Sequence, residues 1–308
     1  MRILVIGAGA VGGYFGGRLA AAGRDVTFLV RAARKAQLER GGLQVLDTYG
    51  DFVVQPKMLL EEELKAKPEV FDLILVSTKA YSLEAAMEAF APAVGAETVI
   101  LPLLNGMRHM DALDERFGAE HVVGGSVQII GDMDAEGRVH SLGKLHDLNY
   151  GERDGSVTER MRVIDAEMCD AGFEANLKPD ILAFMWQKWT LLAAMGAITC
   201  LLRGSVGAVA AAPGGLETAQ AMAAECVAIA AANGYPPAEA FHAVMMKRLT
   251  EAGSPLTASM YRDMQKGARV EADHILGDLL ERGRRHGVEA PLVRAAFAQL
   301  SVYSASVG

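Results

Sequence analysis

The fold is decided by residues 1–30, which read MRILVIGAGAVGGYFGGRLAAAGRDVTFLV. The run Arg2–Ile6 is apolar and largely β-branched after its first residue, as in a strand buried on both faces of a parallel sheet. Residues 7–12, GAGAVG, follow at once and match G-x-G-x-x-G; we call them the glycine turn. In this pattern Gly7 permits a tight turn, Gly9 lets a pyrophosphate approach the backbone, and Gly12 lets helix and strand pack closely. The turn therefore predicts an anion site at a helix N-terminus, where free N–H groups and the helix dipole favour negative charge.

Glycine turns also join strands to helices where no ligand binds, so the context of the motif decides its interpretation. Here the glycine turn lies between an N-terminal strand and an amphipathic segment that contains Tyr14, Phe15 and Leu19. Residues 25–30 then supply a second strand, which completes the order expected of a dinucleotide-binding unit. This context favours nucleotide binding over a purely structural turn.

The residues after the second strand indicate which nucleotide binds. An NAD site places an acidic residue there for the ribose 2′-hydroxyl, whereas an NADP site accommodates the 2′-phosphate with arginine. This chain has Arg31, Arg34 and Lys35, and no acidic residue between positions 27 and 36. A guanidinium pairs bidentately with phosphate, so we expect NADP(H), with Arg31 as the main contact and Arg34 or Lys35 as its support. The alternative is a solvated helix start.

The composition limits the classes of protein that this chain can be. Its 308 residues are 51% hydrophobic and 22% charged, which is ordinary for a folded protein of one large or two medium domains. The formal net charge of -8 argues against nucleic acid or an anionic membrane as the main partner. An anionic substrate would therefore need local positive charge.

The cysteines and apolar segments predict the compartment. Cys169, Cys200 and Cys226 lack both C-x-x-C and metal-ligand spacing, so we expect reduced core thiols and no metal site. The chain begins directly with a strand, and the longest apolar segment, Leu191–Leu202, is short for a membrane span. We expect a cytoplasmic protein without a signal peptide.

Two further predicted strands end in polar residues. Phe71–Val76 leads into Lys79, and Thr98–Leu101 leads into Asn105 and Gly106. Ligands of open α/β sheets bind at the carboxyl ends of the strands, so Lys79 and Asn105 are expected at the same edge as Gly9. The alternatives are a solvated loop lysine and an ordinary Asn-Gly turn.

The second half of the chain changes character. Residues 121–150 alternate like antiparallel strands, which we expect to extend the nucleotide sheet. A helix over 157–171 and a short strand over 173–177 follow, and after Pro179 the chain is predicted to be helical. We expect an α/β fold with a Rossmann-type, doubly wound N-terminal domain over 1–175 and an all-helical domain over 176–308. That second domain has many alanines and could pair with itself in a homodimer.

Three polar residues of the helical part are candidates for chemistry. Lys188 lies among apolar and aromatic residues, where desolvation would lower its pKa and suit it to proton transfer; the alternative is a snorkelling surface lysine. Ser259 precedes a polar segment that it could simply cap, and Glu271 could simply face water.

The chain resembles the ketopantoate reductase (2-dehydropantoate 2-reductase) family over essentially its whole length. Matching motifs stand in the family's order: GAGAVGGYFGGRLAAAG, STKAY, LLNGM, VVGGSV, W-x-K ending at Lys188, T-x-SM containing Ser259, and VEAD containing Glu271. The resemblance implies a Rossmann-type domain followed by a helical domain, with the active site in the cleft between them. It also implies hydride transfer from NADPH to the keto carbon of a 2-oxo acid, which in this family is the ketopantoate of pantothenate biosynthesis.

The resemblance also implies roles for individual residues. Lys188 matches the family's general acid, which protonates the developing alkoxide and contacts the substrate. Ser259 matches a residue that binds substrate, and Glu271 and Asn105 match residues that contact both cofactor and substrate. Lys79 and Arg31 match positions on the cofactor side, as do the glycines of the turn.

The chain departs from the family pattern around the substrate. The family usually has asparagines one and two turns after the lysine and another before the glycine of the following loop, where this chain has Leu192, Gly196 and Val206. Loss of substrate hydrogen bonds lowers discrimination for a polar substrate by roughly 10⁴-fold in favourable cases. We therefore expect an NADPH-dependent reductase of a 2-oxo acid for which apolar substrates outperform ketopantoate. The alternatives are an imine or opine-type reductase and a catalytically lapsed NADP(H)-binding sensor.

Overall fold

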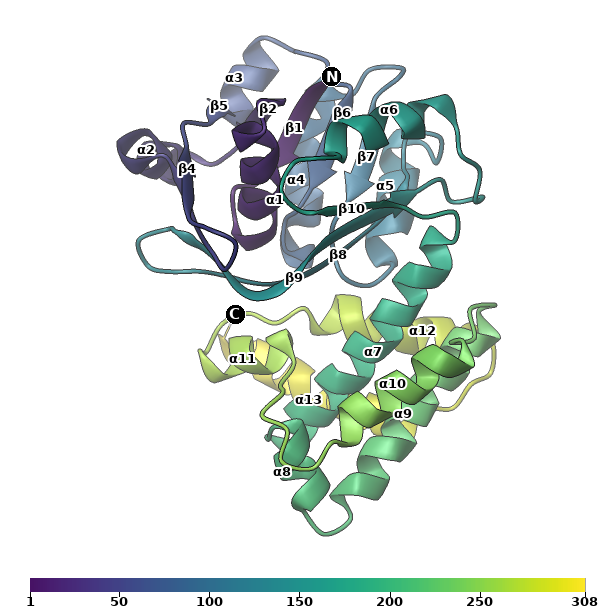
Figure 1. Ribbon diagram of the computed structural model, residues 1–308. Helices are drawn as coiled ribbons and strands as arrows, with labels where there is room; N and C mark the ends of the chain where they lie inside the picture. Colours follow the sequence, from purple (N-terminus) through teal and green to yellow (C-terminus); the bar gives the residue numbers. More distant parts are fainter. Residues whose placement is uncertain (308) are drawn as a thin grey trace. The chain divides into compact units, whose positions relative to one another are not determined.

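The computed structural model describes residues 1–307 and divides by internal contacts into two compact units (Figure 1). The first unit comprises residues 1–104 and 109–182, and the second comprises residues 105–108 and those from 183 onward. The sequence places the boundary at residue 175, which lies inside a strand, β10 (Glu174–Leu177). That strand pairs with β9 (Val139–Gly151) of the first unit, so the first unit extends past it.

The other elements of the first unit alternate between strands and helices. They are β1 (Arg2–Ile6), α1 (Ala10–Ala21), β2 (Asp25–Leu29), α2 (Ala32–Gly41), β3 (Leu43–Asp47), β4 (Phe52–Val54), β5 (Lys57–Leu59), α3 (Glu61–Ala66), β6 (Leu73–Val76), η1 (Ala80–Ser82), α4 (Leu83–Phe90), η2 (Ala91–Ala93), β7 (Val99–Pro102), α5 (Arg108–Phe117), β8 (Gly124–Met133) and α6 (Glu159–Met168).

Five of these strands form a parallel sheet in the order β5-β2-β1-β6-β7. The central strands are buried on both faces, as their unbroken apolar sequences predict. The expected Rossmann-type architecture is confirmed. The edge strand β5, only three residues long, was not predicted because it is too short to show a period.

The strands over residues 121–150 do not extend the nucleotide sheet, so that part of the prediction is wrong. They are two long antiparallel strands, β8 and β9, of a second sheet. Its strand order is β10-β9-β3-β4, and β8 pairs with β9 outside this order. Only an isolated bridge from Val122 to Ile100 connects this segment to the parallel sheet. The alternation of apolar and polar residues indicates which face of a strand is buried, but it does not indicate with which strand it pairs. The sequence therefore could not distinguish the two sheets.

Helix α1 packs tightly because glycines line the side that meets the sheet. A Cβ at Gly16 would lie 2.8 Å from the Phe28 ring and 2.9 Å from Val5 Cγ2. Tyr14, Phe15 and Leu19 of the same helix are fully buried in the core of this unit. The amphipathic segment after the glycine turn therefore forms the expected helix.

The second unit is helical, as predicted. Its elements are α7 (Ile181–Leu202), which begins at the end of the first unit, α8 (Val206–Ala211), α9 (Gly215–Ala232), α10 (Glu239–Thr250), α11 (Ser259–Gln265), the π-helix η3 (Asp273–Gly277), α12 (Asp278–Arg285) and α13 (Pro291–Val307). Helix α9 contacts α8, α10, α12 and α13. Its Glu225 carboxylate accepts hydrogen bonds from the backbone N–H groups of Leu292 and Val293, which caps the N-terminus of α13.

Helix α7 is longer than the apolar segment that the sequence indicates. By length and composition alone it could cross a membrane, and 61% of its most apolar stretch is buried inside the structure. The core helix of a globular unit passes the same test, because both environments favour apolar residues all round the helix.

Candidate functional site

The glycine turn has the geometry of a nucleotide-binding turn. Gly7 has a φ of 89°, in the left-handed region that favours glycine. A Cβ at Gly12 would collide with Ser77 Oγ and the Gly7 carbonyl, whereas a Cβ at Gly9 would meet nothing within 4 Å. Gly12 thus permits close packing, and Gly9 faces open space at the N-cap of α1. These residues fit the pyrophosphate of a dinucleotide.

The basic residues after β2 divide into different roles. Arg31 is exposed at the N-cap of α2, and no hydrogen bond or ion pair holds its side chain to another described residue. Arg34 instead donates from Nη2 and Nε to the Ala8 carbonyl, at 2.8 and 3.1 Å, and Lys35 pairs with Glu63 at 2.7 Å. Arg34 and Lys35 are therefore occupied within the protein, and Arg31 is the one available to a phosphate.

Lys79 lies where the sequence places it. It is exposed just beyond the carboxyl end of β6, which pairs in parallel with β1. Ser77 of the same segment donates a hydrogen bond of 2.8 Å to the Ile6 carbonyl. Lys79 and the glycine turn therefore share one edge of the parallel sheet, as predicted from the strand order. Asn105, in contrast, packs with the second unit.

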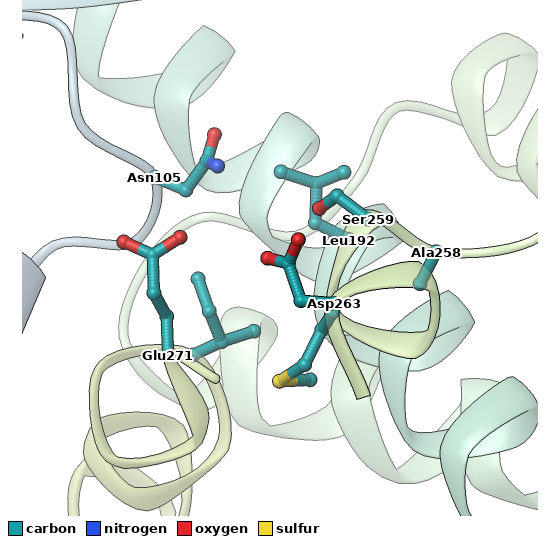
Figure 2. A pocket seen from close by; sticks show the side chains of 8 residues that line it. Asn105, Leu192, Ala258, Ser259, Asp263 and Glu271 are labelled. Carbon is teal, nitrogen blue, oxygen red and sulfur yellow. The ribbon is translucent and has the colours of Figure 1, made fainter. Parts of the chain in front are cut away.

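A pocket in the second unit brings together three of the predicted residues, and we call it the Ser259 pocket (Figure 2). The space between its lining residues, counted together with the open solvent at its mouth, is about 370 Å³. Its lining is half polar and half apolar: Asn105, Ser259, Asp263, Glu271, Leu192, Ala258, Met260 and Ile275. Figure 2 shows the carboxylates of Asp263 and Glu271 pointing into the space between Asn105 and Ser259. This composition suits a small ligand that has both polar and apolar parts.

Lys188 lies on α7 one turn before Leu192, on the same side of the helix. Burial lowers the pKa of its ammonium to about 8, and the Glu271 carboxylate opposes that shift. A lysine with this pKa is protonated at neutral pH and gives up its proton readily. This result favours the interpretation of Lys188 as a proton donor over that of a solvated surface lysine.

Ser259 does not cap a helix and Glu271 does not simply face water, which were the alternatives that the sequence left open. The N-cap of α11 is Ala258, so Ser259 is the first helical residue and its side chain does not cap the helix. Glu271 is partly buried and lines the pocket. Asp263 is a pocket residue that the sequence analysis missed; its i, i+4 spacing from Ser259, which places both on one side of α11, was the available signal.

The π-helix η3 packs against the turn that contains Asn105, on one side of the pocket. Gly106 has a φ of 82°, and a Cβ there would lie 2.9 Å from the carbonyl oxygen of His274. Trp189, next to Lys188, donates an indole hydrogen bond of 3.0 Å to the Ile275 carbonyl. Turns of π-helix often occur at functional sites, and this one joins α7 to the Asn105 turn.

The three positions that lack the family's asparagines have different surroundings. Leu192 lines the pocket, and Gly196 leaves room for the Met260 methyl group, which would lie 2.8 Å from a Cβ at that position. Val206 is fully buried, and its N–H donates to the Leu256 carbonyl. Two of the three departures thus replace an amide with apolar surface at or beside the pocket.

Residues 3–155 match the family model Ketopantoate reductase PanE/ApbA, and residues 180–304 match the model of its C-terminal part. The chain is 35% identical to "Uncharacterized oxidoreductase YkpB" from Bacillus subtilis, over 99% of both chains. A solved 2-dehydropantoate 2-reductase from Geobacter metallireducens is 28% identical and has a TM-score of 0.86, covering 98% of this chain and 99% of its own.

The fold is also that of a D-mandelate dehydrogenase solved with NADH and anilino(oxo)acetate, which is 20% identical with a TM-score of 0.86 and covers 100% of this chain and 99% of its own. The family's motifs, its two-unit architecture and these matches agree. The chain belongs to the ketopantoate reductase PanE/ApbA family and is an oxidoreductase of that family.

Proposed function

We propose that the protein reduces a small, largely apolar 2-oxo acid to the 2-hydroxy acid with NADPH. The observation that carries the proposal is Lys188, a partly buried lysine whose pKa is lowered to about 8 by desolvation and which interacts with the charge of Glu271. Pocket residue Leu192 lies one turn further along the same side of α7. Reduction of a ketone needs a hydride and a proton, and this arrangement supplies the proton.

The residues of the chain have separate tasks in this reaction. NADPH, when bound, supplies the hydride. Lys188 holds a proton on Nζ for the developing alkoxide and stabilises its negative charge, which is largest in the transition state. Ser259 and Asn105 donate hydrogen bonds to the carboxylate and carbonyl oxygens of the substrate. Glu271 keeps Lys188 protonated and accepts a hydrogen bond from a ligand hydroxyl.

The preference for the phosphorylated cofactor rests on Arg31. It is exposed beyond β2, and the neighbouring Arg34 and Lys35 are already engaged. Hydrogen bonds to a charged group contribute about 1.5–3 kcal/mol, so Arg31→Ala should weaken NADPH about ten- to hundredfold and leave NADH unchanged. Dissociation constants from calorimetry test this; a wild-type protein that binds both cofactors equally would contradict it.

The substrate preference rests on the apolar part of the Ser259 pocket. We expect 4-methyl-2-oxopentanoate and phenylglyoxylate to be reduced with a higher kcat/KM than ketopantoate, because Leu192 and Met260 offer no hydrogen bond to the hydroxyl of ketopantoate. Phenylglyoxylate is the oxidised form of mandelate, the substrate named for one protein with this fold. NADPH oxidation at 340 nm measures each rate. A clear preference for ketopantoate would overturn this part of the proposal.

A further inference from the structure

Four hydrogen bonds hold the guanidinium of Arg34, and two of them go to the glycine turn. Nη2 and Nε donate to the Ala8 carbonyl at 2.8 and 3.1 Å, and Nη1 donates to the Gly137 carbonyl at 2.8 Å and to Gln37 Oε1 at 2.6 Å. An arginine has five N–H donors, so one is left. A bidentate grip on a phosphate would require Arg34 to give up contacts inside the protein.

The Ala8 carbonyl belongs to the same peptide unit as the Gly9 N–H. Because a trans peptide is planar, its C=O and N–H point in opposite directions. Two hydrogen bonds that hold the carbonyl toward Arg34 therefore turn the Gly9 N–H away from it. Gly9 faces open space at the N-terminus of α1, where a pyrophosphate would bind. A charged donor on the carbonyl also polarises the peptide and strengthens its N–H as a donor.

The same arginine connects the glycine turn to the turn between β8 and β9. Gln37 accepts from Arg34 and donates to the Glu136 carbonyl at 2.6 Å, next to Gly137. On the other side of this connection, a Cβ at Gly13 would lie 2.8 Å from Val139 Cγ2. The start of α1, the start of α2 and the β8–β9 turn are thus fixed to one another within the first unit.

We propose that Arg34 is a positioning residue for the dinucleotide: it orients the Ala8–Gly9 peptide toward the pyrophosphate and does not bind the ribose 2′-phosphate. This inference rests on the proposed NADP(H) site and assigns a role to a residue that the sequence analysis placed beside the 2′-phosphate. It requires that Arg34 and Arg31 affect different parts of the cofactor.

Three ligands separate those parts. NADH carries the pyrophosphate without a 2′-phosphate, adenosine 2′-monophosphate carries the 2′-phosphate without a pyrophosphate, and NADPH carries both. Calorimetric dissociation constants are measured for the wild type, Arg34→Met, Arg34→Lys and Arg31→Ala. Arg40→Met is the matched control, because it removes an exposed cation from the last turn of the same helix. Melting temperatures show that each variant is folded.

We expect Arg34→Met to weaken NADH and NADPH by the same factor, about tenfold, and to leave adenosine 2′-monophosphate unchanged. Arg34→Lys, which keeps the charge but lacks the planar fork, should also weaken both dinucleotides. Arg31→Ala should weaken the binding of NADPH and adenosine 2′-monophosphate and leave that of NADH unchanged, and Arg40→Met should leave the binding of all three ligands unchanged.

Three results would overturn the inference while leaving the proposed function intact. In the first, Arg34→Met weakens the binding of NADPH but not of NADH, which would make Arg34 a 2′-phosphate contact. In the second, Arg34→Met changes the affinity for none of the ligands. In the third, it weakens the binding of adenosine 2′-monophosphate as strongly as that of NADH. A wild-type protein that binds no dinucleotide would overturn the proposed function together with the inference.

Discussion

Lys188 shows how much a single residue's surroundings determine its chemistry. An exposed lysine has a pKa near 10.5, at which proton donation near neutral pH is slow. Desolvation within the helical unit brings the pKa of Lys188 to about 8, and Glu271 limits the fall. The sequence indicated this residue only through its apolar neighbours and the family motif; its interaction with Glu271, from a distant segment of the chain, is visible only in the structure.

The pH dependence of the reaction follows from this pKa. In the proposed reaction Lys188 is the general acid and must be protonated, so kcat/KM for reduction should fall as the pH rises through about 8. Glu271 raises the pKa of Lys188, so Glu271→Gln should move the descending limb to lower pH. Rates measured across pH 6 to 10, at saturating NADPH, check both expectations. An unmoved limb, or a shift to higher pH, would contradict the pairing of Glu271 with Lys188.

Leu192 lines the pocket, and we expect it to disfavour polar substrates. Leu192→Asn returns an amide to the pocket wall and should raise kcat/KM for ketopantoate about tenfold relative to 4-methyl-2-oxopentanoate. Val206→Asn is the control, because Val206 is fully buried and does not line the pocket. Val206→Asn should leave the ratio of the two kcat/KM values unchanged. It should lower the free energy of unfolding by about 1–3 kcal/mol, since it buries an amide without a hydrogen-bond partner. Equal shifts of the ratio in both variants would show that Leu192 does not control substrate choice.

At the scale of elements, the π-helix η3 is the feature that the sequence could not reveal. Its five residues read as ordinary helix, and their widened turn becomes visible only in the structure. It presents the His274 carbonyl to Gly106 and the Ile275 carbonyl to the Trp189 indole. The Asn105 turn, the Lys188 helix and the Glu271 segment therefore meet at one element.

Gly106→Ala tests whether the contact between the Asn105 turn and η3 contributes to activity. Alanine in the left-handed region costs about 1–2 kcal/mol, and its Cβ at Gly106 would also press on the His274 carbonyl. Gly234→Ala is the matched control, since Gly234 has a similar φ of 88° with nothing within 4 Å of its Cβ. Both variants should melt at lower temperature, but only Gly106→Ala should lower kcat/KM, by about tenfold or more. If both variants kept full activity, the contact between Gly106 and η3 would have no catalytic role.

The strands show a similar division between what sequence predicts and what it does not. Buried parallel strands such as β1 and β6 were predicted because their apolar runs are unbroken and end in recognisable turns. The sheet to which β8 and β9 belong was not predicted, because the packing of distant segments determines which strands pair. Arg34 illustrates the same limit: its charge suggested a phosphate, and its hydrogen bonds connect it to Ala8 and Gly137 instead.

At the scale of the whole molecule, each unit carries one part of the proposed reaction. The glycine turn and Arg31 lie in the first unit, and Lys188 lies in the second with the Ser259 pocket. The family's motifs predicted cofactor residues in the first unit and substrate residues in the second. Membership of the family is shown by matches over most of the chain. The substrate is less predictable, because the proposed preference depends on a few side chains such as Leu192, where this chain departs from the family pattern.

The most direct test of the central claim is NADPH oxidation by the wild type, Lys188→Met and Lys247→Met with a panel of 2-oxo acids. Lys247, exposed on α10, is the matched control. We predict reduction of an apolar 2-oxo acid by the wild type, unchanged kcat in Lys247→Met, and a loss of about 10²–10⁴-fold in kcat in Lys188→Met. No turnover of any 2-oxo acid by a protein that binds NADPH, or equal activity of the two variants, would contradict the assignment.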